Sequence, residues 1–562
     1  MVEEFAGTEA PLREDEEIAA TIATVLRAEE KSSTINDTVD DDQGWQMVSY
    51  RNRKRKQPIK LQESFSDEQS IVVATAGDNS ASKPNDEGYD GDGETKSGIG
   101  NGGVETKKSE LKKPKVTVAQ AAAEIDASDL AIFLAEIKDI YEFQEDIQLV
   151  RLADYFSRAF RSVSATQFPW MKILKESSAS NMVDIPFSHI PEAVYKISTD
   201  WLKQRSFEAL GSFALWSLDI LLADLDVQNR AAEGSKRVVQ SEPSKSQVAI
   251  FMVLAMTLRQ KPNVLISLMP IIRESLKYQG QDKIPLKAWM IAQACQGDLF
   301  VGLFMWVRFL LPALTNKSSC SPQSRDLILQ SVERILSFPK ARPILLKSAV
   351  RKGKRLVPPS ALDLLMRATF PACGARIKET ERLEAVYPIL KEIACAGSEG
   401  SKAMKQITQQ MFQIAIKAAG EGVPDLSVEA ASILVWCLME NPECYKLWER
   451  IYLDNLEASI VVLGKLANGW KEFSVKHPAH EPLKLTLASF RQKNEKALGE
   501  EGDAAHEALL NDVEKHCKIL LRQLSRINLS LKIMVFVSMG LVISAAVVMF
   551  QIMHSWDFRE LL

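Results

Sequence analysis

Histidine and cysteine residues are the first candidates for catalytic or metal-binding chemistry in this 562-residue chain. His477 and His480 are close enough in "KHPAHEP" to serve as two zinc ligands, but no cysteine or third type of ligand stands near them. His516 precedes Cys517, and adjacent residues of one helix point apart, so these two cannot form a catalytic pair. The loop "GSEGSK" lacks the length of a phosphate-binding loop. We therefore predict no catalytic, cofactor-binding or metal site, and a protein that is not an enzyme.

A cluster of basic residues near the N-terminus could bind an anion. It follows the aromatic stretch "GWQMVSY" and comprises Arg51, Arg53, Lys54, Arg55, Lys56 and Lys60. Such a cluster can direct a protein to the nucleus, bind RNA or rest on an anionic membrane, where each cation contributes about 1 kcal/mol. Trp45 and Tyr50 would add stacking or interfacial contacts. The alternative is a solvated run of charge. Nucleic-acid binding stays open but is not favoured, because the net charge of the chain is −4.

Residues 1–116, which contain this basic cluster, are predicted to form a largely disordered arm. Residues 1–44 are mainly acidic, and "GDNSASKPNDEGYDGDGETKSGIGNGG" is dominated by Gly, Ser, Asp and Asn. A segment of this composition cannot bury enough apolar surface to offset its chain entropy. Any site with fixed geometry must therefore be positioned by the elements that follow.

From residue 117 to residue 500 the apolar residues recur with a helical period, which predicts an all-α body. In "SPQSRDLILQSVERILSFP", Ser321 can cap a helix and Pro322 suits its first turn. Ser360 is the expected N-cap in "PPSALDLLMRATFP", and Gly420 is expected to close the helix of "SKAMKQITQQMFQIAIKAAGEG". No strand pattern is evident. Helices of this length with short loops favour a HEAT- or armadillo-like solenoid, with a compact multi-helix bundle as the alternative.

The stretch "DLFVGLFMWVRFLLPAL" is apolar enough to imitate a membrane span. It is short, and Arg308 within it would cost about 2.5–3.5 kcal/mol at the centre of a bilayer. We predict a buried core helix in which Arg308 reaches a partner or solvent.

The stretch "KIMVFVSMGLVISAAVVMFQIM" at residues 532–553 contains no ionisable side chain from Ile533 to Phe550. An apolar run of about 18 residues can cross a bilayer core as a helix. We predict one transmembrane anchor in the lipid bilayer and a short lumenal tail at residues 554–562, with a buried core helix as the alternative. The residues assigned to the anchor are Ile533, Val537, Leu541, Val542, Val548 and Phe550.

Charge and cysteine usage predict that the body stays in the cytosol, so that the protein is a single-pass, tail-anchored one. The N-terminal "MVEEFAGTEAPLREDEE" is acidic and lacks the apolar core of a secretory signal. Five basic residues precede the anchor, and no positive excess follows it: Lys515, Lys518, Arg522, Arg526 and Lys532. Seven scattered cysteines without a C-x-x-C pair are typical of a reduced compartment. The sequon at Asn316 is then expected to stay unglycosylated.

Residues 501–531 are predicted to form a juxtamembrane amphipathic helix. Its apolar residues recur at spacings of three and four, as in the seam of a coiled coil: Leu510, Val513, Cys517, Leu520, Leu524 and Ile527. One hypothesis is weak self-association into a homo-oligomer through this seam. The alternative is a last helix of the body that packs against its neighbour.

Several blocks, taken in order, resemble the transmembrane protein 214 family of endoplasmic reticulum membrane proteins, in a plant-type form. They are "GWQMVSYRNRKRKQ", "AQAAAEIDASDLAIFLAEI", "SKSQVAIFMVLAMTLRQKPNVLI", "PLKAWMIAQACQGDLFVGLFMWVRFLLPAL" and "LMENPECYKLWERIYLDNLEASIVVLGKLANGW". The resemblance covers Trp45 to the anchor. It implies residence in the endoplasmic reticulum membrane and a scaffold role, which in animal members is linked to apoptosis under reticulum stress through recruitment of a procaspase.

The residues and the resemblance together predict a non-enzymatic scaffold or adaptor on the endoplasmic reticulum membrane. Its cytosolic helical surface would bind protein partners that the sequence does not name, because such a surface binds well and needs no cofactor. The alternative is an RNA- or ribosome-associated protein that is tethered to the membrane and uses the basic arm.

Overall fold

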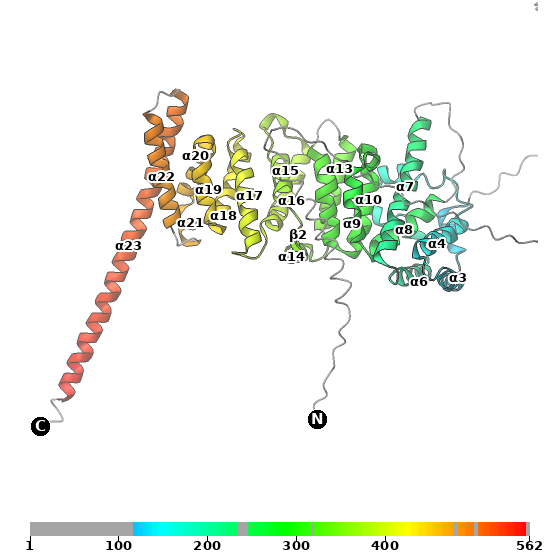
Figure 1. The fold of residues 1–562 in the computed structure, drawn as a ribbon, viewed down its shortest axis with the longest axis horizontal. Helices are drawn as coiled ribbons and strands as arrows, with labels where there is room; N and C mark the ends of the chain where they lie inside the picture. The colour runs from blue at the N-terminus through cyan, green and yellow to red at the C-terminus, as the bar shows by residue number, and fades with distance from the viewer. Residues whose placement is uncertain (1–115, 233–245, 316–319, 477–479, 500–503, 558–562) are drawn as a thin grey trace, which may run out of the picture. The chain divides into compact units, whose positions relative to one another are not determined.

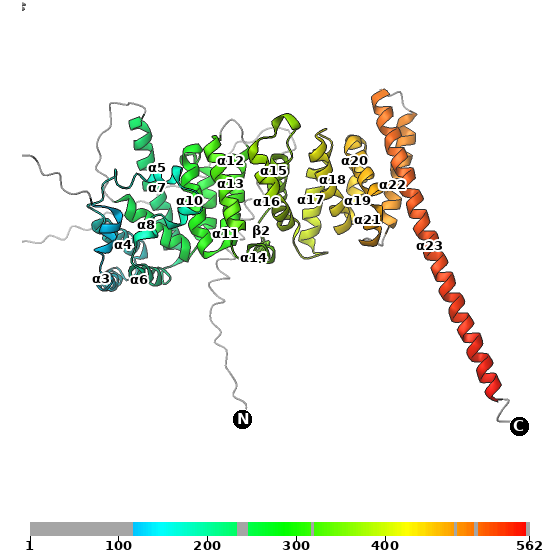
Figure 2. The same cartoon turned by 180° about the vertical axis from the view of Figure 1, so that it is seen from behind.

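The computed structural model describes residues 116–232, 246–315, 320–476, 480–499 and 504–557. The chain divides into two units, Met1–Lys113 and Pro114–Leu562, and only the second contains described residues. The predicted disordered arm therefore lies outside the described residues. The described residues of the second unit form helices and one small β-hairpin (Figures 1 and 2).

The second unit begins with helices whose starts are capped by polar side chains. Thr117 and Gln120 form a capping box at the start of α2, and Asp126 accepts a 2.7 Å bond from the Ser128 amide at the start of α3. These first elements are α2 Val118–Ala123, α3 Ala127–Ile140, α4 Glu145–Ala159, α5 Trp170–Glu176, η1 Asn181–Asp184, η2 Phe187–His189, α6 Glu192–Leu202 and α7 Phe207–Ala232.

Helix α8 is the centre of the next group. Every residue from Val248 to Leu258 is buried, so this helix must be covered on all sides, and it packs against α4, α6, α7 and α10. The group comprises α8 Gln247–Gln260, α9 Val264–Glu274, η3 Leu276–Tyr278, η4 Gln281–Lys283, α10 Ile284–Gly297, α11 Leu299–Met305, the π-helix η5 Trp306–Leu310, α12 Leu311–Thr315, α13 Pro322–Leu336 and α14 Ala341–Lys347.

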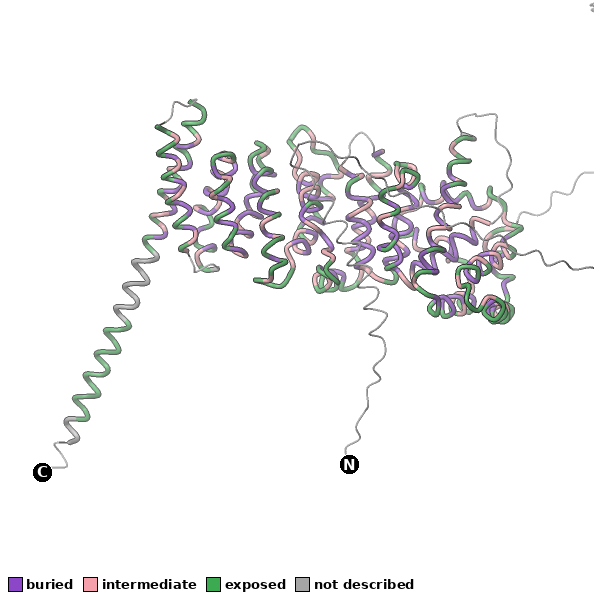
Figure 3. Tube along the Cα trace, viewed as in Figure 1, coloured by how far each residue is buried: buried purple, intermediate pink, exposed green. Residues whose placement is uncertain are grey.

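Aromatic side chains connect α8 to its neighbours. The Phe251 ring lies 4.7 Å from the Trp289 ring of α10 and 5.2 Å from the Trp170 ring of α5, measured between centroids. Trp289 also donates a 2.9 Å hydrogen bond to the Ile185 carbonyl. Figure 3 shows buried segments along the inside of these helices. Large rings of this kind supply much of the buried apolar area of a core.

The segment that imitates a membrane span is a buried core helix, as predicted, but a π-helix interrupts it. The residues from Phe300 to Val307 are all buried. Arg308 donates to the carbonyls of Arg355 at 3.0 Å and Leu356 at 3.3 Å, and its guanidinium lies 3.4 Å from the centroid of the Phe304 ring. The expected partner of Arg308 is therefore the backbone that follows α14.

A small antiparallel hairpin, of which the sequence shows no strand pattern, separates α14 from the last group of helices. Strands β1 Val350–Arg351 and β2 Lys354–Arg355 pair with Val350 opposite Arg355. Lys352 and Gly353 make the turn, with φ angles of 49° and 75°. Strands of two residues are too short to show an alternating pattern in the sequence.

Three of the four predicted helix-end signals are confirmed, including Pro322 in the first turn of α13. Ser321 caps α13 by accepting a 3.2 Å bond from the Ser324 amide, and Gly420 follows the end of α17. Ser360 is not a cap, because α15 begins at Pro359, where a missing N–H costs nothing. The group comprises α15 Pro359–Thr369, η6 Cys373–Ala375, α16 Lys378–Cys395, α17 Lys402–Ala419, α18 Pro424–Glu440, α19 Glu443–Ile451, η7 Leu453–Asn455, α20 Leu456–Asn468, α21 Trp470–Lys476, α22 Glu481–Leu498 and α23 Ala504–Asp557.

Helices in this last group pack mainly on neighbours in the chain. Helix α17 contacts α18, α18 contacts α20, and α20 and α22 both contact α23. The Phe490 ring of α22 stacks 3.9 Å from Tyr452 and meets Trp448 of α19 edge-on at 5.1 Å. The all-α class of the body is confirmed, whereas its arrangement as a HEAT- or armadillo-like solenoid stays a prediction.

Helix α23 runs without a break across most of the predicted juxtamembrane segment and the whole of the predicted anchor. Among the residues that the structure describes, no helix has the combined length and hydropathy required to cross a membrane. The transmembrane anchor stays a prediction.

Alanine should have opposite effects at two helical glycines, because only Gly302, at the contact between α10 and α11, is closely packed. A Cβ on Gly302 would lie 2.0 Å from the sulfur of Cys295, so Gly302→Ala should lower the free energy of unfolding by about 1–3 kcal/mol through overpacking. A Cβ on Gly211 of α7 meets nothing within 4 Å, so Gly211→Ala should raise the free energy of unfolding by about 0.5–1 kcal/mol. Thermal unfolding of the full chain in detergent measures both. A Gly302→Ala chain as stable as wild type would contradict the close packing.

Candidate functional site

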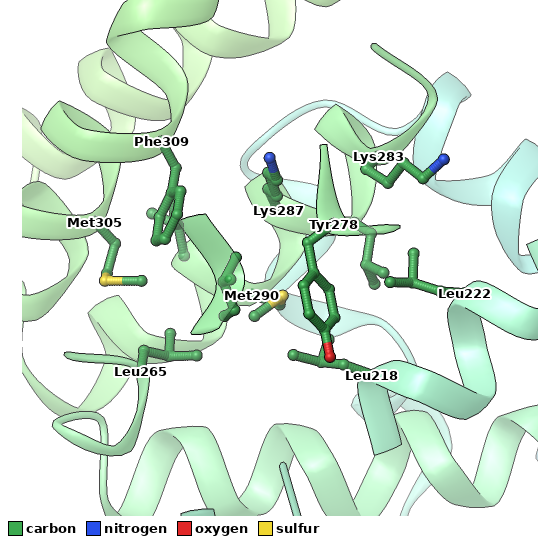
Figure 4. Close-up of a pocket in the computed structure, with 12 residues that line it drawn as sticks. Leu218, Leu222, Leu265, Tyr278, Lys283, Lys287, Met290, Met305 and Phe309 are labelled. Carbon is green, nitrogen blue, oxygen red and sulfur yellow. The ribbon is translucent and has the colours of Figure 1, made fainter. Parts of the chain in front are cut away.

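An apolar pocket lies between α7, α9, α10 and η5. Apolar residues one turn apart on α7 and α10 place several members of its lining on the same helix faces. Figure 4 shows the amino groups of Lys283 and Lys287 on the side of the pocket away from Leu218 and Leu265. The lining comprises Leu218, Leu222, Leu265, Ile272, Tyr278, Lys283, Leu286, Lys287, Met290, Ile291, Met305 and Phe309.

Lys287 is the group of this pocket with the most altered acid–base behaviour. Its amine lies 3.5 Å from the Gln279 side-chain oxygen and 5.6 Å from the centroid of the Phe309 ring. Burial among apolar side chains lowers the pKa of Lys287 to about 8, although the Asp282 carboxylate acts in the opposite direction. Tyr278 donates a 2.5 Å bond to Asp219, and burial together with that bond raises the pKa of the phenol.

The size of the pocket limits what it can hold. A lysine with a lowered pKa in apolar surroundings resembles the nucleophile of Schiff-base enzymes. The volume of this cavity is about 30 Å³, which is room for about two water molecules. The hydroxyl of Tyr278 is bonded to Asp219, so it does not form an acid–base pair with Lys287. We interpret the pocket as a small gap in the packing of the core with an ionisable group at its rim.

The predicted anchor residues whose side chains are described are exposed. Leu541, Val542, Val548 and Phe550 belong to a group of large apolar residues between Met539 and Met553 that are 47–69 % exposed. The side chains of two further members, Ile533 and Val537, lie outside the described residues. The structure therefore shows a long apolar surface at the C-terminal end of α23.

The predicted self-association seam is buried against other helices of the same chain. Its five described members are all buried where α23 packs against α20 and α22: Leu510, Val513, Cys517, Leu520 and Leu524. The side chain of the sixth member, Ile527, lies outside the described residues, as does the whole basic cluster of residues 51–60. This arrangement corresponds to the alternative of a last helix packed against its neighbours.

The histidines and cysteines do not assemble a site within the described residues. His480 stacks 5.5 Å from the Trp470 ring, and His516 contacts the Asp512 carbonyl at 2.8 Å while Cys517 is buried. Burial raises the pKa of the Cys517 thiol to about 12, which makes it a poor nucleophile. No group of three or more His, Cys, Asp or Glu in the described part of the chain could hold a metal ion.

A second charged region, which the sequence analysis did not single out, surrounds the β-hairpin. Residues 340–355 contain seven basic and no acidic residues: Lys340, Arg342, Lys347, Arg351, Lys352, Lys354 and Arg355. We call this region, α14 together with β1 and β2, the basic hairpin surface. Its signal was present in the sequence as a run of like charge, but the run is interleaved with the apolar residues of a helix.

The lowered pKa of Lys287 predicts a pH-dependent cost in stability. At pH 7 the folded chain carries a charged amine among apolar side chains, so Lys287→Met should raise the free energy of unfolding by roughly 2 kcal/mol. The advantage of Met should shrink between pH 8 and 10.5, because there the folded wild type holds the neutral amine while the unfolded chain still binds a proton. Chemical unfolding at pH 7 and pH 10 measures it. Equal differences at both pH values would show that Lys287 is not desolvated.

The chain is similar to one family of known proteins. The family model described as "TMEM214, C-terminal, caspase 4 activator" matches residues 50–560. Transmembrane protein 214 of Homo sapiens is 22 % identical over 415 residues, which is 72 % of this chain and 53 % of that protein. Transmembrane protein 214 of Bos taurus is 27 % identical over 237 residues, which is 42 % of this chain and 31 % of that protein.

These matches extend over much of the chain but not over whole relatives. Transmembrane protein 214-A of Xenopus laevis is 25 % identical over 272 residues, or 37 % of its own length. The chain thus spans between about a third and about half of the length of the curated relatives it matches. No solved structure matches it. Because the family model matches residues 50–560, this chain belongs to the TMEM214 family.

Proposed function

We propose that this chain is a non-enzymatic adaptor of the endoplasmic reticulum membrane. Residues 532–553 anchor it in the bilayer, and the helical body stands in the cytosol, where it binds protein partners. The exposed apolar end of α23 is the observation that carries the proposal. Its described large residues between Met539 and Met553 are exposed, although burying one such side chain stabilises a protein by about 1.5–3 kcal/mol. An apolar surface of this extent requires an apolar environment.

The basic residues that precede the apolar end of α23 support the proposed orientation of the chain in the membrane. Lys515, Lys518 and Arg522 precede the apolar stretch on α23 itself, and the positive-inside bias keeps such residues on the cytosolic side. The name of the curated relatives, Transmembrane protein 214, supports a membrane location. The description of the family model as a caspase 4 activator supports a link to apoptosis, which is part of this proposal and not a finding about the chain.

The helical body is suited to binding proteins and offers no described site for turnover. The pocket beside Lys287 has a volume of about 30 Å³. The cysteines are buried except for Cys395, which is partly buried, and Cys373, which is exposed. Exposed apolar residues are present on several of its helices, among them Ile132 and Ile140 on α3 and Val428 on α18. Residues of this kind on a rigid helical scaffold are typical of surfaces that recognise other proteins.

One charge in the apolar end of α23 tests the anchor. Val542→Arg places a cation near the middle of the span, where it costs about 2.5–3.5 kcal/mol, so a larger share of the protein should leave the membrane pellet on carbonate washing. Val428→Arg introduces the same charge at an exposed site on α18 and should leave the pellet unchanged. Equal retention of both variants would remove the spanning helix from the proposal.

The sequon at Asn316 tests the side of the membrane on which the body lies. A cytosolic body never meets the glycosylation machinery of the reticulum lumen, so Asn316 should carry no sugar. Treatment with a glycosidase, followed by gel electrophoresis, should leave the mobility of the wild-type chain and of an Asn316→Gln variant identical. A shift seen for wild type only would place the body in the lumen.

A further inference from the structure

The basic hairpin surface keeps part of its positive charge in the folded chain. Arg342 bonds the Glu392 carboxylate at 2.7 and 2.8 Å, and Arg351 pairs with Asp298 at 2.6 Å. Arg355 donates to the carbonyls of Ala394 and Ala396, so no acid neutralises it there. Lys340 and Lys347, both exposed, have no acidic partner among the residues that the structure describes. The surface therefore presents the charges of Lys340 and Lys347 to solvent.

Apolar side chains stand among these cations. Ile344 on α14 and Val350 on β1 are each 44 % exposed, and Pro343 is exposed beside them. An apolar tip next to lysine and arginine is the combination that suits the boundary between lipid headgroups and acyl chains. A nucleic acid would use the charge but would not account for these exposed apolar residues.

The surface is held in place by aromatic rings of α11. The guanidinium of Arg351 lies 3.9 Å from the centroid of Phe300, and the amine of Lys354 lies 5.8 Å from the centroid of Phe304. The two rings stack on each other at 5.6 Å. Cation–π contacts of this kind fix the hairpin on the buried core, so little ordering is required when the surface binds.

The hairpin lies on the same side of the helical body as the end of α20, beyond which α23 continues. Arg355 reaches the C-terminal carbonyls of α16 and, at 3.8 Å, the sulfur of Met404 in the first turn of α17. The far end of α17, at Gly420, approaches Ala458 near the start of α20. Helix α20 therefore ends on the hairpin side, and there Gln523 of α23 donates a 3.4 Å bond to the Ala467 carbonyl. The apolar part of α23 follows beyond this point (Figure 1).

We propose that the basic hairpin surface docks on the anionic headgroups of the lipid bilayer. This inference rests on the proposed function in one respect: the proposed anchor defines which side of the helical body faces the bilayer. Each exposed cation near an anionic leaflet strengthens binding by about fivefold at low salt, and the effect falls as salt rises. Docking of this kind would hold the helical body against the membrane instead of leaving it tethered by α23 alone.

Hydrogen exchange of the full chain in phosphatidylcholine vesicles, with and without phosphatidylserine, tests the proposal. The amides of residues 348–356 should exchange about fivefold more slowly with phosphatidylserine, and high salt should remove the difference. Lys340→Glu together with Lys347→Glu should abolish it as well. The matched control Lys417→Glu, an exposed lysine at the opposite end of α17, should leave it intact. Exchange is measured separately for residues 51–60 and 348–356, so lipid binding by the basic cluster is read as a signal of its own.

Each outcome decides the question. Equal exchange of residues 348–356 in both kinds of vesicle overturns the proposal, and so does protection that appears with added RNA or an acidic protein but not with phosphatidylserine. The comparison of low and high salt uses the wild-type chain, so a misfolded variant does not obscure that result. If the anchor fails, the chain washes off with carbonate, yet protection by phosphatidylserine vesicles before washing still supports the docking surface.

Discussion

The fold depends on apolar helix faces that only neighbouring helices can cover. Helix α8 represents one extreme, because all its residues from Val248 to Leu258 are buried by four surrounding helices. Helix α23 shows both situations in one element. Leu510 to Leu524 supply a stripe that α20 and α22 cover, whereas the large residues from Met539 to Met553 extend beyond those helices and are exposed. Hydrophobic burial thus stabilises the body and leaves one apolar surface that needs another environment.

Arginine side chains secure the places where this packing of helices is interrupted. Arg308 leaves the π-helix η5 and bonds the backbone carbonyls of Arg355 and Leu356, while Arg355 in turn bonds the end of α16. Arg259 donates to the side chain of Gln293 and the carbonyl of Val183. Unpaired carbonyls at helix ends are costly when buried, and a guanidinium with five N–H donors can satisfy two at once. These bonds link segments that are far apart in the sequence.

The two basic regions of the chain belong to different units. The basic cluster of residues 51–60 belongs to the first unit, which lies outside the described residues. The basic hairpin surface is part of the folded body, stacked on Phe300 and Phe304 and placed at the end of the layer past which α23 runs. A membrane adaptor with a body oriented by such a surface would present its opposite helix ends to partners.

The sequence by itself determined the helical class of the body, because a period of 3.6 residues and end signals such as Ser321 and Gly420 act over a single turn. It also pointed to the apolar stretch from Ile533 to Phe550. Only the tertiary structure decided which apolar stripes are used internally, as at Leu510 and Leu520, since periodicity reveals a face but not what covers it. The π-helix at Arg308 and the hairpin at residues 350–355 were decided there too, because both depend on contacts between residues almost fifty positions apart.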